Sequence, residues 1–205
     1  MPRIVPNGNI ALTNGNHLAS LATRHSAKPI MQSDTSAVTT YTSICLVLLR
    51  ETRLERNIPQ AHIADQLGKT PSAWTKIETG KTPLTFEVLF RVCQSMGIWP
   101  STAIGAMERY AQFFSYNGLF VVAKELDFNE DSLLIDSQEY YSSPGFRARI
   151  GSWGFQALNG PIYNANGDAT IPDVFRFCLD KEFRKEQLDP KQPLLPTYKF
   201  SAGAL

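Results

Sequence analysis

The side chains best suited to chemistry in this chain lie between positions 70 and 81. If residues 71–79 form a helix, Trp74 and Ile77 share its apolar face, and short polar side chains and one cation share the other. Hydroxyl and ammonium groups at helical spacing can form hydrogen bonds with base edges in a DNA groove. The expected outward face consists of Pro71, Ser72, Thr75, Lys76 and Thr79.

The composition and motifs of the chain do not favour a metal site, a nucleotide-binding site or a catalytic site. The chain has three histidines and three cysteines, and none of them stands at metal-ligand spacing. These residues are His17, His25, His62, Cys45, Cys93 and Cys178. The sequence contains neither a phosphate-binding glycine loop nor a G-x-S-x-G nucleophile motif. We therefore expect no metal, no cofactor and no catalytic activity, and we interpret the cysteines as free thiols.

The residues around this outward face predict a bundle of five helices between Thr42 and Asn117. Thr70 and Pro71 suit the start of the third helix, because threonine caps free N–H groups and proline has no N–H to lose. Each helix is followed by a residue that tolerates a left-handed backbone; these residues are Asn57, Gly68, Gly80, Gly97 and Gly118. On the fourth helix we expect one apolar face made of Phe86, Leu89, Phe90, Cys93 and Met96.

The second and third helices are joined by a short turn at Gly68. Helices joined in this way pack at a steep angle, so the second of the pair can project from the body of the domain into a major groove. Ala64 is small where the two helices would cross, and Leu67 adds an apolar contact to the core. The sequence therefore predicts a helix-turn-helix unit whose third helix carries the outward face.

The stretch RLERNIPQAHIADQLGKTPSAWTKIETGKTPL resembles the XRE family, the Cro and lambda-repressor type of helix-turn-helix DNA-binding protein. The matching residues are Gln60, Ala64, the Leu67-Gly68 pair, and Ile77-Glu78 with Gly80. The resemblance extends through the fourth helix and covers about residues 42–100. It implies a mainly α lambda-repressor-like domain in a bacterial or phage protein.

The resemblance also implies roles for single residues. Gln60 stands where the family holds a phosphate and braces the third helix, and Lys81 stands where a phosphate contact is common. Arg53 and Glu78 stand where the family often has a buried arginine–carboxylate pair. The recognition positions that face DNA are Thr70, Pro71, Ser72, Thr75 and Lys76.

Three residues depart from the family pattern: Thr52 replaces an aliphatic residue, Pro59 a serine or threonine, and Pro71 a hydrogen-bonding reader. The last departure leaves Ser72, Thr75 and Lys76 as the expected base readers.

The rest of the chain divides by charge and pattern. The net charges are +2, +2 and −3 for residues 1–37, 38–100 and 101–205. We expect a flexible arm over 1–37, the helix-turn-helix domain over 38–117, and a small α+β region over 118–205. Within that region we expect a strand or helix extension at 119–126, a helix at 129–141, a β-hairpin within 147–171, one helix at 172–188 and an extended Pro-rich tail.

The purpose of residues 118–205 stays open at this stage. Their aromatic side chains suit a small core with dimer contacts, an apolar pocket for a small-molecule effector, or a docking surface for a partner protein. The basic pair Arg147 and Arg149 could also contact DNA beside the third helix.

The prediction for function is a transcriptional regulator, acting as a repressor, that binds double-stranded DNA with an inverted repeat as a homodimer. The alternative is an antitoxin or phage-type interaction protein that binds a partner protein and autoregulates through the same helix-turn-helix. An enzyme with a helix-turn-helix appendage is a third possibility, for which no residues stand out. We expect a cytoplasmic protein, since no signal peptide and no apolar run long enough to cross a membrane occurs.

Overall fold

The computed structural model describes residues 37–149 and 157–189, and these residues are mainly helical. The first five helices are α1 (Tyr41–Glu55), α2 (Gln60–Leu67), α3 (Pro71–Glu78), α4 (Phe86–Ser95) and α5 (Pro100–Tyr116). Later in the chain come α6 (Ser132–Ser142), α7 (Pro144–Arg149), α8 (Asp173–Leu179) and α9 (Lys181–Leu188). Short elements complete the fold: strands β1 (Ala37–Thr40), β2 (Leu119–Val122), β3 (Ile162–Tyr163) and β4 (Ala169–Thr170), and the 3-10 turns Phe128–Glu130 and Ala157–Asn159.

Local sequence signals explain where the first helices begin and end. The Thr70 hydroxyl accepts a hydrogen bond from the Ala73 N–H at 3.2 Å and caps α3, whose first residue is Pro71. Asn57 and Gly68 have φ angles of 53° and 64°, the left-handed conformation that the sequence predicts at the ends of α1 and α2. The five-helix arrangement expected over residues 42–117 is confirmed, with α1 beginning one residue earlier.

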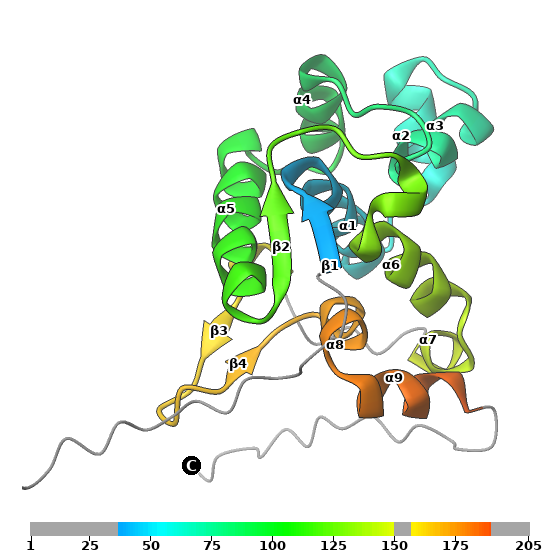
Figure 1. The fold of residues 1–205 in the computed structure, drawn as a ribbon. Helices are drawn as coiled ribbons and strands as arrows, with labels where there is room; N and C mark the ends of the chain where they lie inside the picture. Colours follow the sequence, from blue (N-terminus) through cyan, green and yellow to red (C-terminus); the bar gives the residue numbers. More distant parts are fainter. Residues whose placement is uncertain (1–36, 150–156, 190–205) are drawn as a thin grey trace, which may run out of the picture.

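A parallel pair of strands, of which the sequence predicted neither β1 nor the pairing, precedes and follows the five helices. Ala37 pairs with Leu119 and Thr40 with Val122, so β1 and β2 lie side by side, with β2 next to α5 (Figure 1). Residues 119–122 are therefore a strand and not an extension of α5. Strand β1 occupies the four residues before α1, where no periodic pattern predicted an element.

Asp131 ties this strand pair to α6. Its carboxylate accepts hydrogen bonds from the Thr39 hydroxyl at 2.8 Å and the Ser43 hydroxyl at 2.6 Å. It also caps α6 by accepting from the Leu134 N–H at 3.1 Å. Because Asp131 is buried, these three donors together replace the water it loses.

The buried apolar side chains on the two sides of residue 118 form one core cluster. Tyr110 and Phe114 of α5 pack on Phe175 of α8, with ring centroids 4.7 and 5.0 Å apart. Figure 1 shows α2, α3 and α4 at one end of the molecule, and α7, α8 and α9 with the β3–β4 hairpin at the other. The division of the chain after residue 117 stays a prediction.

The last part of the chain differs in detail from expectation. The predicted helix over 172–188 is two helices, because Asp180 leaves the helical conformation and caps α9 through the Phe183 N–H at 3.0 Å. The predicted hairpin is present as β3 paired antiparallel with β4. Residues 1–36 of the expected arm and the Pro-rich tail from residue 190 lie outside the described residues. No described helix is long and apolar enough to cross a membrane.

Candidate nucleic-acid interface

Helices α2 and α3 are anchored by their inner faces. Ala64 of α2 is fully buried where the two helices meet, as its small side chain predicts, and Leu67 is buried beside it. Trp74 and Ile77 of α3 are also buried in the core. This packing leaves the opposite face of α3 directed away from the core, with its side chains determined by the helical period.

The outward face of α3 holds two kinds of polar side chain. The hydroxyls of Thr75 and Thr79 donate to the carbonyls of Pro71 at 2.9 Å and of Thr75 at 2.7 Å, within the helix itself. Ser72 and Lys76 are exposed, and their side chains make no hydrogen bond or ion pair with any described residue. Ser72 and Lys76 can therefore contact a ligand without giving up an existing bond.

A buried ion pair fixes α3 against α1. The Arg53 Nε donates to Glu78 Oε1 at 2.6 Å, and a second guanidinium nitrogen donates to Oε2 at 3.1 Å. A third donates to the carbonyl of Ile58 at 3.0 Å. The two side chains are 7% and 1% exposed, so both charges are taken out of water. Such a pair fixes the relative placement of the helices more than it stabilises the fold, because desolvation offsets much of the attraction.

Gln60 joins this pair at the start of α2. Its amide nitrogen donates to Glu78 Oε2, and its amide oxygen lies 3.5 Å from the Thr75 hydroxyl that donates to it. The amide therefore connects α2 to both the inner end and the outer face of α3. A primary amide has two N–H donors, so one remains for the phosphate contact that the resemblance implies.

Three further residues of the predicted site lie at the two ends of α3. Thr70 and Pro71 are exposed at its N-terminus, where free backbone N–H groups and the helix dipole favour an anion. Lys81 is exposed in the loop that follows the helix. All the predicted DNA-facing residues therefore lie on α3, at its two ends or at the start of α2.

A comparison with protein-family models supplies the assignment for this part of the chain. Residues 47–98 match the model of a family described as a helix-turn-helix domain. Residues 47–98 form a helix-turn-helix domain. This family is associated with XRE-type DNA-binding regulators, so the match indicates a DNA-binding regulator. No curated protein and no solved structure matches the chain.

The end of α3 contacts α6, and no pattern in the sequence of the helix-turn-helix domain predicts this contact. Gln138 of α6 donates from its amide nitrogen to the carbonyl of Thr79 at 3.2 Å. Next to it, a Cβ added at Gly80 would lie 2.5 Å from Leu134 Cδ1, so α6 packs directly on the end of α3. The glycine at this turn therefore provides both the left-handed φ of 74° and the room for α6. Fifty-nine positions separate Thr79 from Gln138, so no local pattern marks the contact.

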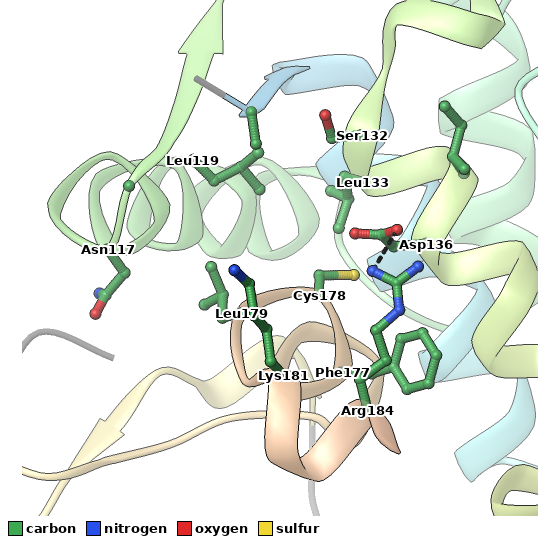
Figure 2. Close-up of a pocket in the computed structure, with 13 residues that line it drawn as sticks. Asn117, Leu119, Ser132, Leu133, Asp136, Phe177, Cys178, Leu179, Lys181 and Arg184 are labelled. Carbon is green, nitrogen blue, oxygen red and sulfur yellow. Dashed lines mark ion pairs between the residues drawn. The ribbon is translucent and has the colours of Figure 1, made fainter. Parts of the chain in front are cut away.

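The other face of α6 borders a cavity of about 290 Å³ shown in Figure 2. Arg184 of α9 pairs with Asp136 at 2.9 Å across it and also with Glu139. Leu119, Leu133 and Phe177 supply apolar walls. Burial raises the pKa of the Cys178 thiol well above its ordinary value, so this cysteine is a weak nucleophile.

The aromatic stretch that suggested a ligand pocket is divided between core and surface: Phe113, Phe114, Tyr140 and Tyr141 are buried, whereas Tyr116, Phe120 and Tyr163 are exposed. Among the described aromatic residues, only Phe177 lines the cavity, and Trp153 and Phe155 lie outside the described residues. Arg147, one of the two residues of the expected second basic contact, lies on α7 at the opposite end of the molecule from α3 (Figure 1), and the side chain of Arg149 lies outside the described part of the chain. This placement argues against a DNA contact by Arg147 beside α3.

Proposed function

We propose that this protein is a sequence-specific transcriptional regulator that binds an inverted-repeat operator as a homodimer. Helix α3 enters the major groove, and binding over a promoter makes repression the direct consequence. In this proposal the protein carries no catalytic activity, and DNA is its ligand.

The observation that carries the proposal is the contrast between the two faces of α3. Its inner face is held by the Arg53–Glu78 pair at 2.6 Å and by the buried Trp74. Its outer face presents Ser72 and Lys76, both exposed and uncommitted among the described residues. A rigidly held helix with exposed donors and acceptors is what reading of base edges requires, because each contact depends on placement.

The proposed division of labour follows from position along the helices. Ser72, Thr75 and Lys76 read bases, with the Thr75 hydroxyl oxygen acting as an acceptor while its hydrogen stays directed at the Pro71 carbonyl and the Gln60 amide oxygen. Gln60, Thr70 and Lys81 contact phosphates, which set the register of the helix on the duplex. Two such helices related by a two-fold axis would lie about 34 Å apart, one DNA turn, and this spacing calls for an inverted repeat.

Selection of bound sequences from random double-stranded DNA, at two salt concentrations, tests the proposal. We expect a recovered palindrome with half-sites about 10 base pairs apart, and a binding constant that falls steeply with salt because phosphate contacts release counterions. Lys185→Ala removes an exposed lysine of α9, far from the proposed site, and should select the same sequence as the wild-type protein.

Recovery of no sequence above the random background would refute the proposal. Purification of the protein with a second protein at fixed stoichiometry, without sequence-selective DNA binding, would favour the interaction-protein alternative in its place.

A further inference from the structure

Helix α4 exposes an aromatic pair at one edge of the apolar face that the sequence predicts. Phe86 is 68% exposed and Phe90 is 44% exposed, and their ring centroids are 4.6 Å apart. Leu89, Cys93 and Met96 are buried as expected, so the error concerns one edge of the predicted apolar face. Single exposed aromatic residues are ordinary, but two rings in contact on the free face of a helix form a continuous apolar patch.

Two opposite charges flank this aromatic pair. Glu87 and Arg91 lie one turn apart on α4, and their nearest charged atoms are 3.9 Å apart. Their side chains are 80% and 44% exposed, so the ion pair contributes little to the monomer. Glu87 lies nearer the N-terminus of α4 and Arg91 nearer its C-terminus. Phe86 and Phe90 have the same spacing of four residues along the helix.

This order of residues is complementary to itself. When two copies of α4 pack antiparallel about a two-fold axis near Leu89, Phe86 of one copy meets Phe90 of the other. The same axis brings Glu87 of each copy to Arg91 of the other, so two opposite-charge pairs border four aromatic rings. Contacts made by the same patch on both subunits are the form that a two-fold dimer interface takes.

We propose that the α4 surface, defined by Phe86, Glu87, Phe90 and Arg91, is the contact between two copies of this chain. The inference rests on the proposed function for its purpose, since α4 follows α3 directly and a two-fold axis at α4 relates two recognition helices. It goes beyond that function by naming the surface and its charge pairing.

The size of the patch decides how strong the contact is. With about 200 Å² for each aromatic side chain, the exposed fractions leave roughly 220 Å² of aromatic surface per copy. Stable interfaces bury about 800 Å² per partner. The contact is therefore weak in free solution, and it acts mainly as cooperativity when two copies occupy adjacent half-sites.

Charge reversal tests the pairing. Glu87→Arg places two basic residues opposite each other in the dimer, and Arg91→Glu places two acidic ones, so each variant alone should lose association. An equimolar mixture of the two variants restores both opposite-charge pairs and should associate again. A partner of any other kind would not produce this rescue. Glu186→Arg, an exposed reversal on α9, is the matched control and should leave association unchanged.

The aromatic pair is tested in parallel. Phe86→Ala with Phe90→Ala should reduce association, whereas Tyr116→Ala, which removes an aromatic side chain that is 86% exposed on α5, should not. Circular dichroism and thermal unfolding of every variant separate lost association from lost folding. Arg91→Glu also removes the hydrogen bond from Arg91 to the Gln66 carbonyl. Restored association in the mixture would show that the loss of this hydrogen bond does not cause the loss of association.

Two readouts are used: sedimentation velocity over increasing protein concentration, and titration of selected DNA with either one half-site or two. We expect cooperative binding to two half-sites, weakened roughly tenfold or more by each single reversal, with unchanged affinity for one half-site. Association with the predicted rescue but no selective DNA binding would leave the surface standing and refute the proposed function. Selective binding without cooperativity, from a protein monomeric at every concentration, or absence of rescue on mixing would overturn the α4 surface.

Discussion

The two parts of this molecule are held together by contacts of very different range. Within the helix-turn-helix domain, the Arg53–Glu78 pair and the Gln60 amide connect residues no more than 25 positions apart. The later part is held by contacts that reach back much further: Asp131 to Thr39 across 92 positions, and the Ala157 N–H to Glu55 across 102.

This difference indicates that the five helices are the scaffold on which the later part of the chain packs. Asp131 joins α6 to β1 and α1, and Gln138 joins α6 to the end of α3. Helix α3 is thus held twice, by contacts within the helix-turn-helix domain and by a contact from α6 outside it. The following predictions remove these braces and contacts in turn, beginning with the largest expected effect.

Removal of the inner brace should have the largest effect. Arg53→Ala leaves the Glu78 carboxylate buried without its guanidinium partner, so we expect the free energy of unfolding to fall by about 3–5 kcal/mol. Urea denaturation followed by circular dichroism measures this loss. Arg53→Met combined with Glu78→Leu should recover most of it, because no unpaired charge remains buried. A loss below about 1 kcal/mol for the single variant would contradict the assignment of a desolvated brace.

Removal of the outer tie should come next. Asp131→Ala leaves the hydroxyls of Thr39 and Ser43 without their acceptor and removes the cap of α6, so we expect a loss of about 2–3 kcal/mol. Asp127→Ala changes an exposed aspartate four residues away and should be nearly neutral. Unfolding of the wild-type protein should show one transition, since one core cluster spans both parts. Two separate transitions would show that the later part is an independent unit.

Two lysines should separate base reading from phosphate contact. Under the proposed function, Lys76→Ala costs about 1–3 kcal/mol of binding to the selected sequence and relaxes its specificity. Lys81→Ala weakens binding to all sequences alike and lowers the salt dependence by about one counterion. Titrations of selected and random DNA at several salt concentrations measure both effects. Equal loss of sequence preference in the two variants would rule out this division.

The smallest effect is expected where α6 contacts α3. Gln138→Ala removes the hydrogen bond to the Thr79 carbonyl at the end of α3, and we expect about 1 kcal/mol in the free energy of unfolding. Under the proposed function, affinity for the selected sequence falls as well, because the end of α3 loses a fixed neighbour. Gln112→Ala, an exposed glutamine of α5, is the control. DNA affinity equal to wild type, with stability reduced as expected, would confine Gln138 to a structural role.

The helix-turn-helix domain was predictable because its signals are local. Thr70, Pro71 and Gly68 set the ends of α2 and α3 through backbone chemistry that acts within one turn. The apolar period then assigned Trp74 and Ile77 to the core and Ser72 and Lys76 to the surface. The same reasoning failed on α4, where the period grouped Phe86 and Phe90 with buried residues, because the width of a buried face depends on what packs against it.

The strand pair and the α6 contacts could not be predicted in this way. Strand β1 has four residues, too few for a periodic signal, and its partner begins 82 positions later at Leu119. The single helix expected at 172–188 divides at Asp180 because the side chain caps α9, an outcome that competes closely with continuing the helix.

The sequence by itself determined which helices form between residues 41 and 116, where they end, and which face of α3 is polar. These features depend on capping, left-handed turns and the 3.6-residue period, and all of them act over a few residues. The tertiary structure alone decided that α6 supports the end of α3, that Asp131 joins three segments, and that α4 keeps its aromatic pair exposed. Each of these outcomes depends on which segments distant in the sequence come into contact, and the packing of the whole core determines these contacts.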